Sequence, residues 1–117
     1  MNKYRAKKVK TEDGTFDSQA EYARWCELKL LERAGEIAAL NRQGKWGLFV
    51  NGIQVATYRD DFNYLDRSKS CVVVEDVKGF KTPVYRLKKK LMKAIHGIDI
   101  LETGKSSRAT VLGKVAA

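Results

Sequence analysis

The spacing of apolar and polar residues divides this chain into two predicted helices and a group of strands. Residues 18–34 repeat apolar side chains at helical spacing between Ser18, a favourable N-cap, and Gly35, which favours a helix end. The apolar stripe predicted to face a sheet is Ala23, Cys26, Leu30 and Ala34, widened by Tyr22, Trp25, Leu28 and Leu31.

Strand patterns fill the middle of the chain. Residues 45–50 and 53–64 flank an Asn51-Gly52 pair, which strongly favours a hairpin with a type I′ turn. A run of β-branched side chains at the start of residues 71–79 predicts a third, buried strand. Residues 36–40 are predicted to form a short extended or turn segment.

A second helix is predicted from Thr82, with Pro83 at its first position, to His96, where Gly97 ends it. Residues 98–102 complete the pattern as a short strand. The predicted fold is α/β (α+β), in the order α-β-β-β-α-β, with a mixed central sheet flanked by helices. The stripe expected to face the core from this second helix is Val84, Leu87, Leu91 and Ile95.

Length and composition favour one domain. With 117 residues and 44% apolar content, the chain is long enough for one core and too short for two. Residues 1–16 show no periodicity and are predicted to form a basic N-terminal arm. Residues 17–102 are predicted to form the domain, and residues 103–117 a basic, loose tail. Cys26 and Cys71 lack a metal-ligand spacing and are predicted to be small buried hydrophobes.

The sequence offers no signal for a membrane. No apolar run approaches the roughly 20 residues that span a bilayer. The basic N-terminus is followed by polar residues and not by the apolar segment of a signal peptide. We therefore expect a cytoplasmic protein, with no membrane partner and no small-molecule cofactor.

The charge favours a polyanionic partner. The chain has 23 basic and 14 acidic side chains, a net charge of +9, so nucleic acid is the leading candidate and an anionic membrane surface the weaker one. The basic run in the second helix indicates either a solvated face or a grip on a nucleic-acid backbone. The side chains expected to contact DNA are Lys7, Lys8, Lys81, Arg86, Lys89, Lys90 and Lys93.

Acidic residues interrupt the two strands of the central hairpin. Asp60 and Asp61 break an aromatic strand, and the β-branched strand ends in Asp76 and Lys78. Because side chains alternate across a strand, Asp76 and Lys78 share one face while Glu75 points to the other. In register, the two strands bring an aspartate of the first next to Asp76 and Lys78. A carboxylate pair beside an ammonium, held on rigid backbone, can hold a hard divalent cation.

Glu21 has two interpretations. Residues 18–21 match the capping box S-x-x-E, which makes Glu21 a helix cap. Alternatively, Glu21 supplies a further carboxylate to the cation site, and the two roles exclude each other only in part.

The element order, with an acid on the second strand and D-x-K on the third, resembles the PD-(D/E)xK nuclease superfamily. That superfamily includes restriction endonucleases and archaeal-type Holliday junction resolvases. Over residues 16–102 the chain more closely resembles a family of small phage and prophage proteins of unknown function. The residues that carry this likeness are SQAEY, LKLLERAGEI, LNRQ, YRDDFNY, VVVEDVKG and TPVYRLKKKLM.

The resemblance implies a restriction-endonuclease-like core and a set of site residues. Asp61 matches the motif aspartate, Asp76 the D/E position and Lys78 the lysine, while Glu21 matches the first-helix acid of resolvase-like members. The implied metal is Mg²⁺ or Mn²⁺, held by Asp61, Asp76 and Glu21. Asp60 stands where the motif has proline, so the choice between Asp60 and Asp61 stays open. Gln43, shared with the phage family, is a possible supporting residue, as is Asp60.

The implied function is a metal-dependent DNA endonuclease that prefers branched DNA, such as a Holliday junction, and acts as a homodimer. Nicking or restriction-like cutting of duplex DNA is an alternative within this class. A non-catalytic DNA-binding protein would explain the charge but not the converging acids. A structural or host-modulating protein would require those acids to form a buried ion-pair cluster, which stabilises a fold poorly.

Overall fold

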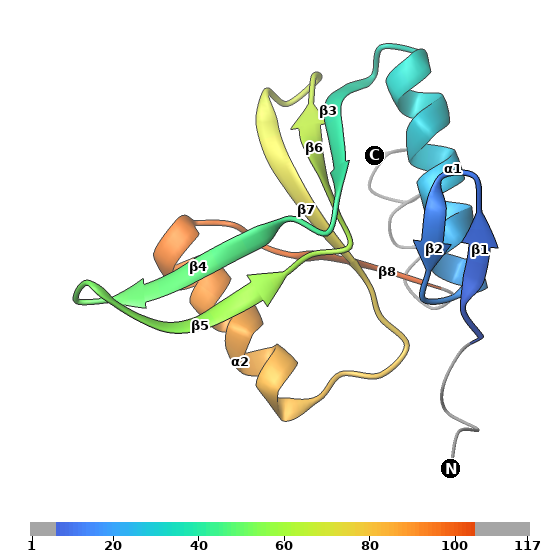
Figure 1. Cartoon of the computed structure of the whole chain (residues 1–117). Helices are drawn as coiled ribbons and strands as arrows, with labels where there is room; N and C mark the ends of the chain where they lie inside the picture. Colours follow the sequence, from blue (N-terminus) through green and yellow to red (C-terminus); the bar gives the residue numbers. More distant parts are fainter. Residues whose placement is uncertain (1–6, 105–117) are drawn as a thin grey trace.

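A four-stranded mixed sheet lies at the centre of the computed structural model, which describes residues 7–104 (Figure 1). The strands lie in the order β3 (Ile37–Arg42), β6 (Phe62–Asp66), β7 (Cys71–Val77) and β8 (Leu101–Thr103). The first three strands pair antiparallel, and β8 pairs parallel to β7. With helices α1 (Gln19–Arg33) and α2 (Pro83–Leu91), this is a mixed α+β fold, as predicted.

The side chains of β7 alternate between two separate cores. Val73 and Val77 pack toward α1, and Val74 packs toward α2. The core on the α1 side contains Phe16, Leu28, Ile37, Phe62 and Tyr64. The core on the α2 side contains Leu48, Tyr58, Val74, Tyr85, Met92 and Ile100. Because of this alternation, the side chains of Glu75 and Asp76 lie on opposite faces of the sheet, as the two-residue period of a strand predicted.

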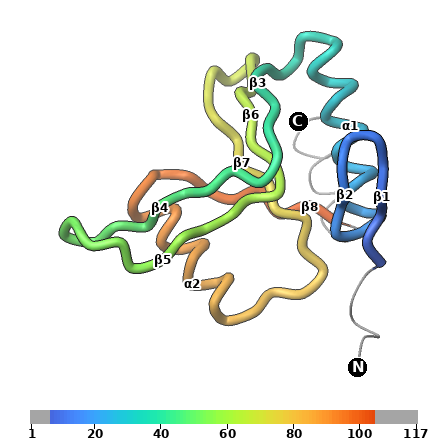
Figure 2. The backbone as a smooth tube through the Cα atoms, in the orientation of Figure 1, coloured from blue at the N-terminus to red at the C-terminus, as the bar shows by residue number. Residues whose placement is uncertain are grey.

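Strands β4 (Lys45–Val50) and β5 (Ile53–Arg59) form a separate two-stranded ribbon. Figure 2 shows this ribbon running away from the four-stranded sheet. Asn51 and Gly52 both have positive φ, 51° and 80°, so the predicted hairpin is present. One face of the ribbon packs on α2 and on η1 (Met92–His96), and His96 Nε2 lies 2.8 Å from the Gly47 carbonyl oxygen.

The predicted strand over residues 53–64 is in fact two strands in two different sheets. It breaks at Asp60 and Asp61, because the fully buried carboxylate of Asp60 accepts from three donors in two segments and turns the chain there. Of the two alternatives predicted for residues 36–40, an extended segment or a turn, the structure shows the extended one, since β3 is an edge strand of the central sheet. Five strands therefore lie between the helices where three were predicted.

The predicted N-terminal arm contains an ordered hairpin. Strands β1 (Val9–Thr11) and β2 (Gly14–Phe16) pair and pack on α1, with Phe16 completely buried. Short strands and a polar turn hid this hairpin from the periodicity analysis. Residues 1–6 of the predicted arm and residues 105–117 of the predicted tail lie outside the described residues.

The predicted apolar stripe of α1 is correct only in part, and Ser18 caps the helix as expected. Leu28 is buried, with Tyr22 and Trp25 packed against the same core, whereas Ala23, Cys26 and Leu30 are exposed. The buried face also includes two charged residues, Glu21 and Arg24, which apolar spacing did not detect. Cys71 is also exposed, so neither cysteine is the predicted buried hydrophobe.

The inward face of α2 is likewise shifted. Val84 and Leu87 are exposed, while Tyr85 and Met92 are buried. The following strand is Leu101–Thr103 and not residues 98–102. Among residues 7–104, no helix has the length and apolarity needed to cross a membrane.

A buried ion pair attaches α1 to the central sheet. Arg24 donates from Nε to Glu75 Oε1 at 2.8 Å and from Nη2 to Glu75 Oε2 at 2.6 Å. The hydroxyl of Tyr64 donates to the same carboxylate, which is fully buried. Bidentate geometry with a further donor satisfies the buried charge, so the pair fixes how α1 lies on the sheet.

Substitution Arg24→Met should lower the free energy of unfolding by about 3 kcal/mol, because Glu75 is left charged and buried without a cation. Urea denaturation measures this loss. Adding Glu75→Gln to Arg24→Met should restore most of the lost stability, since the amide oxygen of the glutamine still accepts from the Tyr64 hydroxyl. The control Glu27→Gln, on the exposed partner of the same arginine, should cost less than about 1 kcal/mol. A double variant as unstable as Arg24→Met would contradict this account.

Candidate cation and nucleic-acid site

Asp61 and Asp76 lie together at the end of the β6–β7 pairing. Phe62 pairs with Glu75, and the ladder continues into the break, where the Asp61 amide donates to the Glu75 carbonyl at 3.0 Å. Asp61 Oδ2 accepts from the Val77 amide at 2.7 Å. The backbone thus holds Asp61 next to Asp76, one of the arrangements that the predicted register allowed.

The surroundings of Asp61 disfavour its charged form. Burial raises the pKa of Asp61 to about 8, and the neighbouring negative charges of Asp76 and Glu21 add to the shift. The Val77 amide lowers the pKa of Asp61 but does not offset these effects. A cation at this position would remove the repulsion.

Asp76 is held from two sides. Its Oδ2 accepts from the Tyr58 hydroxyl at 2.5 Å, and its Oδ1 lies 3.5 Å from Lys78 Nζ. Burial, together with the charge of Asp76, raises the pKa of Tyr58, so this phenol stays a proton donor. The carboxylate of Asp76 is therefore oriented on the α2 side of the sheet, with Lys78 as its cation.

Lys78 reaches solvent while its ammonium stays close to the carboxylates. Its side chain is 25% exposed, and Nζ lies 4.1 Å from the centre of the Tyr85 ring. The Tyr85 hydroxyl donates to Glu102 Oε2 at 2.8 Å. A partly exposed ammonium beside the Asp76 carboxylate can hydrogen-bond a substrate oxygen that enters the site.

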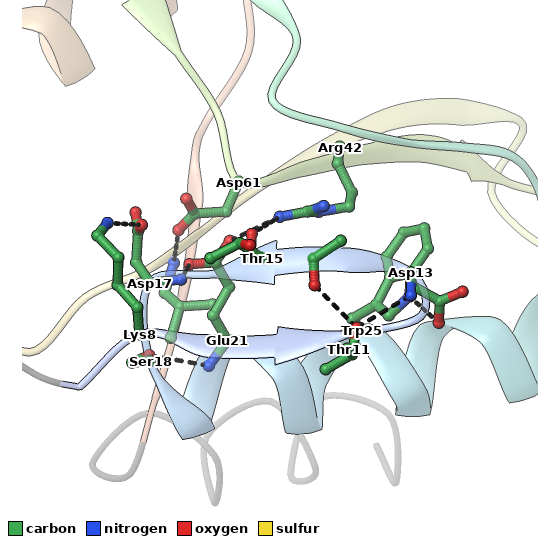
Figure 3. A network of polar contacts seen from close by, with 12 residues as sticks. Lys8, Thr11, Asp13, Thr15, Asp17, Ser18, Glu21, Trp25, Arg42 and Asp61 are labelled. Carbon is green, nitrogen blue, oxygen red and sulfur yellow. Dashed lines mark hydrogen bonds and ion pairs between the residues drawn. The ribbon is translucent and has the colours of Figure 1, made fainter.

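Glu21 lies at the start of α1, where one of its carboxylate oxygens caps the helix and the other is left without a hydrogen bond. Ser18 Oγ accepts from the Glu21 amide at 3.1 Å, and Glu21 Oε1 accepts from the Asp17 amide at 3.2 Å, one residue before the expected capping-box partner. Its buried Oε2 has no hydrogen-bond partner, and the nearest cation, Arg42, is 3.9 Å away. Burial, and then the charge of Asp17, raises the pKa of Glu21. Figure 3 shows Glu21, Arg42 and Asp61 next to the β1–β2 hairpin.

Arg42 and Gln43 support this side of the site. Arg42 lies 3.8 Å over the Phe16 ring and donates to the Thr15 carbonyl at 2.9 Å, so it attaches the N-terminal hairpin to β3. The backbone amide of Gln43 donates to the Asp61 carbonyl at 3.1 Å. Gln43 thus contacts the Asp61 segment through its backbone, next to the candidate cation site.

Asp60 has a different environment from its neighbour Asp61. Its Oδ1 accepts from the Gly44 amide at 2.8 Å, and its Oδ2 accepts from Trp46 Nε1 and Asn63 Nδ2, both at 2.9 Å. These bonds join the start of β4 to the start of β6. The structure therefore places Asp61, and not Asp60, against Asp76, while Asp60 connects the strands behind it.

The donors fit a small hard cation. Within residues 7–104, no three His, Cys, Asp or Glu side chains are gathered closely enough to hold a metal ion as they stand. Mg²⁺ requires fewer protein ligands than three, because it binds through one or two carboxylates and fills its other coordination positions with water and substrate oxygens. Asp61 and Asp76 provide such a pair, and the unpartnered Oε2 of Glu21 lies in the same charged cluster.

A basic groove of about 580 Å³ lies along α2 and η1. Glu102 accepts from Lys81 at 2.9 Å and Lys89 at 3.0 Å, and Asp99 pairs with Lys93 at 3.0 Å. Burial opposes ionisation of Glu102, but the two lysines and Tyr85 lower its pKa to about 2. The groove is lined by Lys81, Arg86, Lys89, Lys90, Lys93, Ala94, Asp99 and Glu102.

The structure thus brings five of the seven predicted DNA contacts into one groove. The other two, Lys7 and Lys8, lie at the N-terminal hairpin, where Lys8 forms an exposed ion pair with Asp17 at 3.0 Å. Lys7 and Lys8 do not line the groove.

Sequence reasoning missed Tyr58, Tyr85 and Glu102. The tyrosines carried a signal, since a phenol in an apolar segment requires a hydrogen-bond partner once it is buried. No signal in the sequence indicated Glu102, because only the parallel pairing of β7 with β8 places Glu102 beside Asp76.

The fold and site define a mixed α+β domain with a carboxylate–lysine cluster at the end of its central strands. The chain belongs to the family described as "Protein of unknown function (DUF1064)", whose model matches residues 1–101. Comparisons with curated proteins and with solved structures found no match.

The adjacent aspartates should respond to amidation in opposite ways. Asp61→Asn should raise the stability measured in EDTA by about 1 kcal/mol, and the melting temperature by about 4 °C, because it removes repulsion from Asp76. Asp60→Asn should lower the stability by about 2 kcal/mol, because one amide oxygen cannot accept from all three donors. Thermal melts of both variants measure the difference. Equal destabilisation would show that Asp61 is also a structural carboxylate.

Proposed function

We propose that this protein is a metal-dependent endonuclease that hydrolyses phosphodiester bonds in DNA. The observation that carries the proposal is the pair Asp61 and Asp76, a half-buried and a buried carboxylate, in which burial and the charge of Asp76 raise the pKa of Asp61 while Lys78 lies beside Asp76. Such a pair has no benefit for packing, whereas Mg²⁺ or Mn²⁺ would relieve it. The basic groove nearby offers a place for the DNA backbone.

Each site residue then has a distinct role. Asp61 and Asp76 would hold the metal, and Glu21, whose Oε2 has no hydrogen-bond partner, would complete the site once its side chain moves toward them. When bound, Mg²⁺ neutralises charge on the phosphate and on the leaving oxygen. Lys78 orients the attacking water and stabilises the negative charge that develops on the phosphoryl oxygen. The Tyr58 hydroxyl keeps Asp76 in its orientation.

The resemblance to the PD-(D/E)xK superfamily supports this assignment. Asp61, Asp76 and Lys78, the three positions that match its motif, lie side by side in the structure. A central mixed sheet with a helix on each side is compatible with a restriction-endonuclease-like core. We accordingly propose that the chain is a small phage-type member of that superfamily, acting in the host cytoplasm.

The proposed substrate is branched DNA, with a four-way junction as the type case. The basic side chains of the groove are suited to contact phosphates, which carry no sequence information, so the protein recognises shape and backbone charge. Symmetric cutting of two strands requires two active sites, which a homodimer provides.

A non-catalytic DNA-binding protein is the second candidate. The observation that favours it is the groove itself, where Arg86 and Lys90 have no ion-pair partner among residues 7–104. Both cations are positioned to contact phosphates. This function leaves Asp61 and Asp76 without a role.

Cleavage of a labelled four-way junction, beside a linear duplex of matched sequence, tests the proposal. Wild-type protein with Mg²⁺ should make paired symmetric cuts in the junction, and EDTA or Asp76→Asn should abolish them. The matched control is Asp66→Asn, because Asp66 caps the β6–β7 turn by accepting from Ser68 and Lys69 amides. This control should cut normally.

Other outcomes separate the alternatives. Metal-dependent cutting of both DNAs would retain the active site and discard the preference for junctions. Tight binding without metal-dependent cutting of either DNA would overturn the nuclease and favour the DNA-binding protein.

Loss of Lys78 should separate metal binding from turnover. Lys78→Ala should keep the Mg²⁺-induced rise in melting temperature, because the carboxylates remain. Turnover at saturating DNA should fall roughly 10²–10³-fold, because the variant lacks the ammonium that faces the reacting phosphate. Lys69→Ala, an exposed turn residue, is the control. Near-wild-type cleavage by Lys78→Ala would refute the role given to this lysine.

A further inference from the structure

A continuous series of contacts connects the basic groove to Lys78. Lys81 and Lys89 bind Glu102 at 2.9 and 3.0 Å, and the Tyr85 hydroxyl donates to the same carboxylate at 2.8 Å. The Tyr85 ring in turn lies 4.1 Å from Lys78 Nζ. Glu102 is thus the one residue in this series that contacts both the groove lysines and the support of Lys78.

The sheet itself places Glu102 at this junction. In the parallel pairing of β7 with β8, Glu102 lies directly beside Asp76, so both side chains leave the same face of the sheet. The side chain of Glu102 is only 15% exposed, and its two oxygens are taken by three donors. Glu102 therefore differs from Asp61, because its charge is already neutralised by lysines of the protein.

Glu102 has two opposing effects on a phosphate-bearing strand. It occupies Lys81 and Lys89, two of the five basic side chains of the groove, and so reduces the charge available to DNA. It also anchors the Tyr85 ring, which keeps the Lys78 ammonium within 3.5 Å of Asp76. One side chain thus weakens binding and supports the reacting lysine.

We propose that Glu102 is a positioning residue that, acting through Tyr85, holds Lys78 for phosphodiester hydrolysis at the expense of DNA affinity in the groove. The proposal rests on the proposed function, since it gives Lys78 the role described above. It predicts that removing the charge of Glu102 tightens DNA binding while slowing turnover. A residue with a merely structural role would weaken both.

Binding and turnover of the four-way junction by Glu102→Gln test this split. The dissociation constant, measured with Ca²⁺ to prevent cutting, should fall roughly threefold, because Lys81 and Lys89 are released to phosphates. Turnover at saturating DNA should fall roughly tenfold, because the glutamine amide, which can still accept from the Tyr85 hydroxyl, lacks the two ion pairs that fix its position, so that Tyr85 and Lys78 can move. Glu36→Gln, which removes the same charge at the α1–β3 turn, should change neither quantity (Figure 1).

A second measurement does not depend on activity. In the free protein, the Tyr85 ring should shift the Lys78 ε-methylene proton resonances upfield, and Lys78→Ala assigns them. Glu102→Gln should move these resonances toward ordinary lysine values. Tyr85→Phe should do the same, because it keeps a ring but loses the hydroxyl that Glu102 anchors. Asp99→Asn, which removes a groove charge paired with Lys93, should leave them unchanged.

The outcomes distinguish this proposal from the proposed function. If Glu102→Gln keeps the upfield resonances and full turnover, the positioning role is refuted while the nuclease stands. If wild type never cuts DNA but Glu102→Gln and Tyr85→Phe release Lys78, the nuclease fails and the positioning of Lys78 stands. Weaker DNA binding by Glu102→Gln would overturn the proposed effect on the groove.

Discussion

The buried ion pair between Arg24 and Glu75 is the interaction on which the arrangement of this protein depends. It joins α1 to the middle of β7, and Glu21 lies one helical turn before Arg24 on the same helix face. Fixing Arg24 therefore also places Glu21 at the end of the central strands, near Asp61. The next residue of β7, Asp76, leaves the opposite face of the sheet. Two adjacent acids on one strand thus have separate uses, one in holding the fold and one in the site.

The contrast between these acids explains why the cluster indicates function. Glu75 receives three hydrogen bonds from Arg24 and Tyr64, so its burial is fully compensated. Asp61 has one backbone donor and a neighbouring carboxylate, and its pKa is raised to about 8. A fold selected only for stability has no reason to keep such a pair. In the proposed nuclease, the same repulsion makes the site ready to accept a cation.

Sequence reasoning predicted the relative placement of the candidate-site residues better than it predicted the core. Strand alternation and pairing depend on a two-residue period, so the positions of Asp76 and Lys78 and the opposite direction of Glu75 followed from the sequence. The full inward face of α1 did not follow from the sequence, because its burial of Glu21 and Arg24 depends on partners that are distant in the chain. The break at Asp60 has the same origin, since its carboxylate binds Gly44, Trp46 and Asn63. The spacing of apolar residues reveals which apolar side chains are buried. It cannot reveal a buried charged side chain whose partner is distant in the sequence.

A crystal structure of the full chain soaked with Mn²⁺ would test the central claim most directly. We predict an anomalous peak about 2.1 Å from carboxylate oxygens of both Asp61 and Asp76, with Lys78 beside it and Asp60 still bonded to its three donors. A peak at Asp99 or Glu102, or no peak in a crystal that binds Mn²⁺ elsewhere, would contradict the account.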